Sequence, residues 1–378
     1  MAVNVLFLHT GGNWIRGSEN ALLTALSRLD RSKIEPFLFC DSTVLAEAAR
    51  TAGIETVLCP MPDIMIDGSV RLQFLRWASS LQRLCSFGRK NDIRVVYCNG
   101  GRSCQVGYYA AKRLRVPVVC HVHCLYNRRY ILLYRLHRAS TVIFVSNAVQ
   151  RSITEKQSFS GMYKVVYNGV DTERFCPPPQ RDKKWRAELS ISPDCMVFGQ
   201  VSSLIPRKGI DVLLRAFHLV TETHPKARLV LVGDGPQRAE YSALADQLGV
   251  SQRVMFVGDQ SDPSVYYRHI FDVNVLASRS DAFPLSLLEA AAAGLPSIGA
   301  DVDGIGEAVL EGKNGFLFNR EDHRMLAAKM SLLASNRNLV SIFGAAGRQL
   351  ALERFSVDTY SESIQASILD QVRCESRL

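Results

Sequence analysis

Residues 196–220, MVFGQVSSLIPRKGIDVLLRAFHLV, join a short apolar run, a basic loop and an amphipathic segment. The run 196–201 is short and apolar, as expected of a strand buried in a parallel sheet. The loop ends in Arg207-Lys208-Gly209, and the apolar residues of 210–220 then recur at helical spacing. A strand, a loop and a helix in this order form one βα unit. The stretch therefore predicts an α/β domain built on a parallel sheet.

The same alternation of Val-, Ile- and Phe-rich runs with longer amphipathic segments continues in both directions. With 378 residues, the chain is long enough for two doubly wound, Rossmann-like domains. We assign residues 1–176 to the first domain, 177–354 to the second and 355–378 to a C-terminal helix. The join lies where turn residues give way to three consecutive prolines. The predicted strands are 3–9, 36–40, 95–98, 117–122 and 141–145 in the first domain and 196–201, 228–232, 254–257, 273–277 and 296–299 in the second.

Composition and local hydropathy narrow the class of protein. No window has the roughly 18 uninterrupted apolar residues that a membrane-spanning helix needs. Residues 2–9 lack the charged start and long apolar core of a secretion signal. The ten cysteines have no pairing pattern, and several fall inside predicted strands, which indicates reduced thiols. We expect a protein that is either free in the cytoplasm or peripheral on the inner face of the membrane.

Positive charge is concentrated in the first domain. Residues 1–176 hold 23 Lys and Arg against 12 Asp and Glu, and the segment 71–138 holds fourteen Lys and Arg with a single acid. This bias indicates an anionic partner: acidic lipid headgroups, a lipid-diphosphate acceptor or nucleic acid. A helix that packs on its sheet and leaves arginines in water is an equal alternative. The spacing of five residues favours a basic amphipathic helix at a membrane surface. These residues are Arg71, Leu72, Leu75, Arg76 and Arg83.

Residues 281–296, DAFPLSLLEAAAAGLP, have an acid and a glutamate on either side of a predicted helix start. Asp281 falls in the turn before the helix. The N–H groups from Leu285 and Ser286 onward have no acceptor within the helix and can face a phosphate. The carboxylate of Glu289, one turn deeper, suits two ribose hydroxyls. The structural alternative is an ordinary helix start between two elements of an α/β domain.

An acid followed after seven residues by a glutamate resembles the signature of retaining nucleotide-sugar glycosyltransferases of family four. These enzymes have the GT-B fold, in which two Rossmann-like domains face a cleft. Arg207-Lys208-Gly209 is similar to the family's diphosphate-binding motif, and residues 314–317 follow at the expected distance. The family has Gly-Arg where this chain has Ser202-Ser203, so Arg207 is expected to supply the missing cation. The resemblance spans nearly the whole chain.

The resemblance implies a transferase that moves a sugar from a nucleoside diphosphate to a glycan or lipid-linked acceptor, in cell-surface polysaccharide or glycolipid synthesis. The second domain would hold the donor, and the basic first domain the acceptor, with the C-terminal helix bracing the first domain. No metal or other cofactor is implied, since fixed cations neutralise the departing diphosphate, which also accepts the proton of the acceptor. Asp301-Val302-Asp303 resembles a metal-binding motif of another architecture but stands where the family has a turn. No nucleic acid is expected as a partner.

The resemblance also implies roles for single residues. His123 closes the strand 117–122 and would contact the donor sugar or orient the acceptor, with His121 as the fallback. Gly17 would approach the donor phosphate two residues before Glu19, although Arg16 replaces the first glycine of the family's motif. Residues implied in catalysis are His123, Arg207, Lys208 and Asp281. Residues implied in donor binding are Gly17, Arg207, Lys208, Gly233, Val257, Asp281, Phe283, Leu285, Ser286 and Glu289.

Three departures from the family pattern keep other functions open: Asp281 in place of glutamate, Ser203 and Arg16. The chain could be a nucleotide-sugar 2-epimerase of the same fold, which needs no acceptor. It could also be a degenerate, non-catalytic protein that binds nucleotide sugars. A metal site at Cys120-His121-Val122-His123-Cys124 is not favoured, because adjacent strand residues point to opposite faces.

Overall fold

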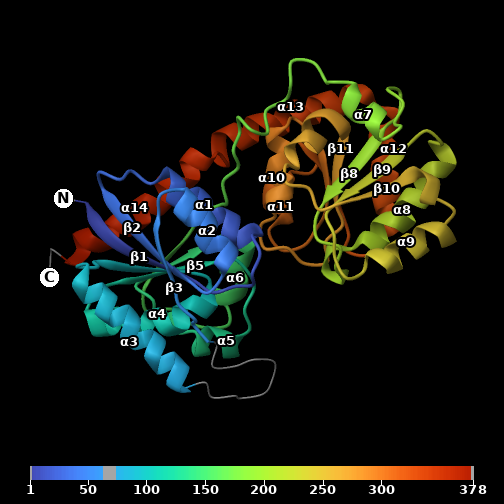
Figure 1. The fold of residues 1–378 in the computed structure, drawn as a ribbon. Coiled ribbons are helices and arrows are strands. Elements are labelled where there is room, and N and C mark those ends of the chain that lie inside the picture. The colour runs from blue at the N-terminus through green and yellow to red at the C-terminus, as the bar shows by residue number, and fades with distance from the viewer. Residues whose placement is uncertain (1, 63–73, 376–378) are drawn as a thin grey trace. The chain divides into compact units, whose positions relative to one another are not determined.

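The computed structural model describes residues 2–62 and 74–375 of the chain. Arg71 and Leu72 of the predicted basic helix lie outside the described residues. The chain divides into two compact units, drawn in Figure 1. The first unit consists of Met1–Gly169 and Val357–Leu378, and the second of Val170–Ser356.

The unit boundaries differ from the predicted ones at 176 and 354. The first boundary falls at Gly169 because the Val170 N–H donates to the Phe355 carbonyl oxygen at 2.8 Å, which ties this residue to the second unit. The ring of Phe175 also packs edge-on against Tyr267 of the same unit. The prolines that we took as the connector therefore belong to the second unit.

The first unit is built on a seven-stranded parallel sheet with the order β3-β2-β1-β4-β5-β6-β7. All five predicted strands are present, with ends that differ from the predicted ones by two residues or fewer. The structure adds two strands that the sequence did not predict, β3 and β7, one at each edge. The strands are β1 (Val3–His9), β2 (Ile34–Cys40), β3 (Glu55–Leu58), β4 (Val95–Asn99), β5 (Val118–Val122), β6 (Thr141–Phe144) and β7 (Met162–Val165).

Helices cover both faces of this sheet. On one face, α14 packs against α1 and brings Tyr360 and Ile364 into a core that also holds Val5 and Phe7 of β1. On the other face, α4 packs closely enough that a Cβ on Gly107 would meet the side chains of Cys98 and Leu8. The helices are α1 (Gly17–Arg28), α2 (Thr43–Thr51), α3 (Phe74–Lys90), α4 (Gly101–Leu114), α5 (Arg128–Leu133), α6 (Asn147–Thr154) and α14 (Val357–Glu375).

The second unit is built on a six-stranded parallel sheet with the order β10-β9-β8-β11-β12-β13. The five predicted strands are present, and the edge strand β13 is added. In β10 the pairing register shifts between Phe256 and Gly258, so Val257 lies in a bulge. The strands are β8 (Val197–Val201), β9 (Arg228–Val232), β10 (Val254–Gly258), β11 (Val273–Leu276), β12 (Ser297–Ala300) and β13 (Gly315–Phe318).

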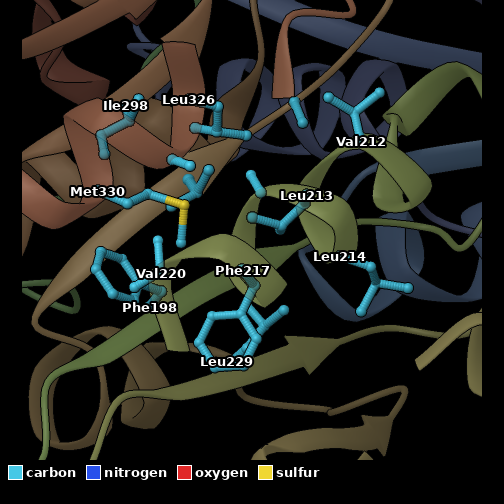
Figure 2. Close-up of a cluster of buried hydrophobic side chains, with 14 of the residues drawn as sticks. Phe198, Val212, Leu213, Leu214, Phe217, Val220, Leu229, Ile298, Leu326 and Met330 are labelled. Atoms are coloured by element: carbon cyan, nitrogen blue, oxygen red, sulfur yellow. The ribbon is translucent and has the colours of Figure 1, made fainter. Parts of the chain in front are cut away.

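The main core of the second unit lies between one face of this sheet and the helices α8, α9 and α12. Figure 2 shows Phe217 and Val220 of α8 with Met330 of α12 and Phe198 of β8 in this cluster. Among the described residues, no helix is both long and apolar enough to cross a membrane. The helices are α7 (Lys184–Glu188), α8 (Ile210–Thr223), α9 (Arg238–Gln247), α10 (Leu285–Ala292), α11 (Ile305–Ala308), α12 (His323–Ser335) and α13 (Arg337–Arg354).

Candidate functional site

The strand order of the second sheet places a ligand-binding edge beside β8. From β8 the chain runs to β9 on one side, and β11 pairs with β8 on the other. The loops that follow β8 and β11 therefore diverge at the carboxyl edge of the sheet, where open α/β folds bind ligands. The first loop carries Arg207 and Lys208, and the second carries Asp281. The fold thus brings together residues that are more than seventy positions apart in the sequence.

Two hydrogen-bond donors and one further cation lie around one carboxylate oxygen at this edge. The further cation, Arg207, donates from Nη1 to the Ser280 carbonyl oxygen at 2.7 Å. Lys208 Nζ donates to Asp281 Oδ2 at 2.5 Å, Ser278 Oγ donates to the same oxygen at 3.3 Å, and Arg207 Nη1 lies 3.5 Å away. The side chains of Lys208 and Asp281 are only 13% and 12% exposed, whereas Arg207 is half exposed. The arrangement binds an anionic oxygen, and in this structure Asp281 supplies it.

Two charged residues hold the loop of Asp281 in place, and the sequence did not single out either as a site residue. Asp303 accepts from the Ser280 hydroxyl at 2.5 Å and from the Asp281 N–H at 2.9 Å. Arg279 makes paired hydrogen bonds with Asp211 (2.7 and 3.0 Å) on α8. Asp303 and Arg279 contact residues that are far away in the sequence, so no local sequence pattern predicts these contacts.

Arg279 also makes paired hydrogen bonds with Glu321, at 2.5 and 3.0 Å, on the loop after β13. The hydrogen bonds to both carboxylates, Asp211 first, raise the pKa of the Arg279 guanidinium above its usual value. Arg279 therefore stays cationic and joins the loop after β11 to two other segments of the second unit.

Glycines allow the loops at this edge to approach one another. Gly209 has φ +64°, and a Cβ there would lie 1.9 Å from the Ala277 carbonyl oxygen. Gly233 has φ +121°, and its Cβ would lie 2.1 Å from the Ser202 carbonyl oxygen. We predicted that Gly233 lets the backbone approach the donor. In the structure the close approach at Gly233 is to the protein's own backbone, and contact with the donor stays a prediction.

The helix α10 begins at Leu285, and the N–H groups of Leu285 and Ser286 lie in its first turn, without an acceptor inside the helix. Phe283 is 4% exposed, and its ring packs 5.5 Å from that of Phe355. The ring of Phe283 thus belongs to the core of the second unit, and its role in donor binding stays a prediction. Val257 remains a candidate through its backbone, since its carbonyl oxygen leaves the regular ladder and accepts from Gln260 at 2.9 Å.

Glu289 lies one turn into α10, where burial raises the pKa of its carboxyl group to about 7. The Tyr267 hydroxyl and the positive charge of Arg174 oppose this increase only in part. The carboxyl group therefore holds its proton more tightly than an exposed glutamate does. A ligand that donates hydrogen bonds to it would favour the ionised form.

The first sheet has its own reversal of strand order, between β1 and β4. His123 follows β5 at the carboxyl edge, and its Nε2 lies 2.7 Å from Asn99 Oδ1. Burial lowers the pKa of His123 to about 3. The His123 ring is therefore neutral at physiological pH.

The other candidates of the first unit differ in access. His121, the fallback for His123, is fully buried, and its Nδ1 is paired with the Tyr97 hydroxyl at 2.8 Å, which withdraws it from substrate. Gly17 opens α1, is exposed, and has no atom within 4 Å of the position that a Cβ would take. The residue before Gly17 is Arg16, and its backbone N–H donates to Glu19 Oε2 at 3.1 Å. Arg16 has φ −128°, so this position does not need a glycine.

No group of three or more His, Cys, Asp or Glu side chains in residues 2–62 and 74–375 is placed to hold a metal ion. In the Asp-x-Asp sequence at 301–303, the carboxylate of Asp303 accepts hydrogen bonds from the Ser280–Asp281 turn.

Comparison with protein families gives two matches. Residues 15–174 match the family described as Glycosyltransferase Family 4, and residues 181–350 match the family described as Glycosyl transferases group 1. A GDP-mannose-dependent alpha-(1-6)-phosphatidylinositol monomannoside mannosyltransferase of Mycolicibacterium smegmatis is 29% identical over 57% of this chain and 59% of its own length. A D-inositol 3-phosphate glycosyltransferase of Streptomyces scabiei is 26% identical over 95% of this chain and 87% of its own length. The chain spans only about three fifths of several such relatives.

Solved structures agree on the fold. HepE from Anabaena, crystallised with UDP, superposes with a TM-score of 0.85 over 97% of this chain and 100% of its own, at 23% identity. Sucrose-phosphate synthase from Thermosynechococcus elongatus gives a TM-score of 0.82 over 99% of this chain and 100% of its own, at 20% identity. The predicted fold class, two Rossmann-like α/β domains of the GT-B type, is confirmed.

Proposed function

The chain belongs to the group 1 glycosyltransferases, and from this premise we propose that it transfers a sugar from a nucleoside diphosphate to a glycan or lipid-linked acceptor, with retention at the anomeric carbon. The observation that carries the proposal is the convergence of Lys208, Arg207 and Ser278 on one anionic oxygen at the ligand-binding edge of the second sheet. The product belongs to polysaccharide or glycolipid synthesis.

Sugar transfer from a nucleoside diphosphate requires fixed positive charges beside the leaving diphosphate. As the bond from the anomeric carbon to the diphosphate breaks, negative charge builds on the leaving oxygens. Lys208 and Arg207 neutralise it, and the first turn of α10 adds N–H donors. Asp281, whose Oδ2 lies beside both cations, would orient the sugar and stabilise the positive charge at the anomeric carbon.

We propose that transfer needs no metal, because these two cations supply the charge that a divalent ion would otherwise provide. The diphosphate itself takes the proton of the acceptor hydroxyl, so no separate general base is required. In this scheme Glu289 binds the ribose, the backbone at Val257 holds the base, and Gly17 approaches the phosphates. Equal transfer rates with and without a chelator are expected; a rate restored only by a divalent ion would contradict this part.

The relatives indicate which donors to test. The mycobacterial relative is named as GDP-mannose-dependent, and HepE was crystallised with UDP and with UDP-glucose. We therefore expect a uridine or guanosine diphosphate sugar to be the donor. Product analysis separates this function from its rivals: transfer gives a glycosylated acceptor, a 2-epimerase gives an epimerised sugar without acceptor, and a non-catalytic protein gives neither.

Replacement of Gly17 by alanine tests whether a donor phosphate approaches this position. A Cβ at Gly17 meets no protein atom, and the residue does not have a positive φ, so the variant should fold with a change in stability below about 1 kcal/mol. Donor affinity, measured by calorimetric titration, should fall about tenfold, because the methyl group would occupy the space of a phosphate oxygen. Unchanged affinity would remove Gly17 from the site.

We also propose that the basic first unit binds anionic membranes, which would bring the enzyme to a lipid-linked acceptor. At the start of α3, Phe74 and Leu75 are 56% and 85% exposed beside the exposed Arg76. Apolar side chains next to arginines fit the boundary between headgroups and acyl chains. Flotation with phosphatidylglycerol vesicles at low salt should recover the protein, and phosphatidylcholine vesicles should not.

A matched pair of variants localises this binding. Leu75→Ser should weaken flotation with anionic vesicles, whereas Leu332→Ser, which changes an exposed leucine of the second unit, should leave it unchanged. Equal recovery with both vesicle types, or no effect of Leu75→Ser, would contradict the proposal.

A further inference from the structure

A buried chain of polar side chains runs across the carboxyl edge of the first sheet and ends at His123. His9 is the last residue of β1, Asn99 is the last residue of β4, and Glu19 lies in the first turns of α1. All three are 4% exposed or less. Their hydrogen bonds determine which nitrogen of each histidine carries a proton.

The orientation of the Asn99 amide is fixed by the backbone. Its Nδ2 donates to the Ser18 carbonyl oxygen at 3.0 Å and to His9 Nδ1 at 2.9 Å. If the amide were rotated by half a turn, Asn99 Oδ1 would face the Ser18 carbonyl oxygen, and two acceptors would meet. Asn99 Oδ1 therefore points to the opposite side, toward His123.

The tautomer of His9 follows from this orientation. Because its Nδ1 accepts from Asn99, the ring proton lies on Nε2, which donates to Glu19 Oε1 at 2.9 Å. The Asn99 carbonyl oxygen is farther from Nδ1, at 3.3 Å. Burial alone would raise the pKa of Glu19, but the interactions with His9 and the backbone N–H donors outweigh it and lower the pKa to about 2. Glu19 is thus an anionic acceptor at the start of the chain of hydrogen bonds.

The tautomer of His123 is set in turn. Asn99 Oδ1 can only accept, so His123 carries its proton on Nε2 and donates it across 2.7 Å. Its Nδ1 then presents a lone pair and has no hydrogen-bond partner among the described residues.

We propose that Glu19, His9 and Asn99 are positioning residues that hold His123 as the neutral Nε2–H tautomer, so that His123 Nδ1 accepts a hydrogen bond from a substrate hydroxyl. This inference rests on the proposed function for the identity of the hydroxyl as one of a sugar or acceptor. It assigns His123 the role of acceptor and excludes that of a cationic acid. Gly11 packs directly against the His9–Glu19 pair. A Cβ at this position would lie 2.7 Å from His9 Nε2 and 3.0 Å from Glu19 Oε1.

The groups that face His123 keep this state over the physiological range. His121 of β5 stacks on it with ring centroids 4.0 Å apart, and burial lowers the pKa of His121 well below its usual value. Tyr97 of β4 and Tyr360 of α14 pack on His121, and burial raises the pKa of both tyrosines. Glu19 is therefore the one anion among these groups.

Nitrogen-15 NMR of the imidazole rings in the full-length protein tests the tautomer without any need for turnover. Wild-type His123, assigned with the variant His123→Gln, should give the signature of a neutral Nε2–H ring near neutral pH. Asn99→Ala should give a mixture of tautomers at His123. Tyr97→Phe, which removes the partner of His121 alone, should leave the His123 signals in the wild-type pattern. An Nδ1–H or doubly protonated His123 in the wild type would overturn the inference.

Kinetics at saturating donor supply the functional readout. Asn99→Ala should lower kcat about tenfold, the factor expected for one hydrogen bond, and Tyr97→Phe should not. Asn99→Asp puts a second anion beside His123 and raises its pKa, so kcat of this variant should fall as the pH is lowered, while the wild type stays level. A wild-type pH profile in Asn99→Asp would also overturn the inference. If the wild type transferred no sugar at all, the proposed function would fail, and the NMR result would still decide the positioning of His123.

Discussion

Replacement of Lys208 by alanine is expected to lower kcat/KM for sugar transfer about 10³-fold while the fold is kept. Removal of one fixed donor from a site that stabilises developing negative charge typically costs two to three orders of magnitude. Lys208 is more buried than Arg207 and is the cation that donates a hydrogen bond to Asp281. Steady-state rates with the best donor of the panel, together with the melting temperature, measure both parts of this expectation.

Lys226→Ala is the matched control. It removes an exposed lysine of the same unit that pairs with Asp194 at 2.6 Å and is not part of the Lys208–Asp281 site. Its rate should equal that of the wild type. A Lys208→Ala enzyme with wild-type kcat/KM would show that the diphosphate is neutralised elsewhere, and the site assignment would be withdrawn.

Glu289→Gln is expected to abolish turnover and to remove a pH dependence of donor binding. The carboxyl group, with its pKa of about 7, must be ionised to accept two ribose hydroxyls. Wild-type donor affinity should therefore rise between about pH 6 and about pH 8, whereas glutamine has one acceptor oxygen and does not titrate. Calorimetric titration at both pH values measures the difference. Equal affinity of wild type and variant at the higher pH would contradict the role of Glu289.

The same substitution should stabilise the free protein at high pH. In the folded state the pKa of Glu289 is raised above its ordinary value of 4.5, so the folded state binds the proton more tightly than the unfolded state. The stability that this group contributes is present at low pH and is lost as the pH rises toward about 7. Glu289→Gln should melt higher than the wild type at about pH 8 but not at about pH 5, and Glu240→Gln, an exposed glutamate of the second unit, should match the wild type at both.

The sequence predicted the buried strands of both sheets and missed three at the edges. β3, β7 and β13 are four residues long, and Glu55, Leu58, Met162 and Tyr163 are exposed. β3 and β7 therefore do not give the continuous apolar run by which a central parallel strand is recognised. β13, with the sequence GFLF, is apolar and mostly buried and was missed all the same. The missed strands have little influence on the site, which lies at the centre of each sheet.

The sequence predicted the site in part, for a similar reason. Cations next to a glycine and an acid before a helix start are local patterns, and Arg207, Lys208 and Asp281 were found by them. Contacts such as Asp303 with the Ser280–Asp281 turn, or Asn99 with His9 and His123, join segments twenty or more residues apart. They depend on which strands are neighbours at a sheet edge. At Gly233 and at the side chain of Phe283, internal packing also explains the residue, and their roles in donor binding stay predictions.

The central claim is that the second unit binds a nucleoside diphosphate sugar through Lys208. Thermal melting of the wild type and of Lys208→Ala with a panel of uridine, guanosine and adenosine diphosphate sugars tests it most directly. The account predicts that at least one member of the panel raises the melting temperature of the wild type and that this shift is lost in Lys208→Ala. A panel that stabilises neither protein, or that stabilises both equally, would contradict it.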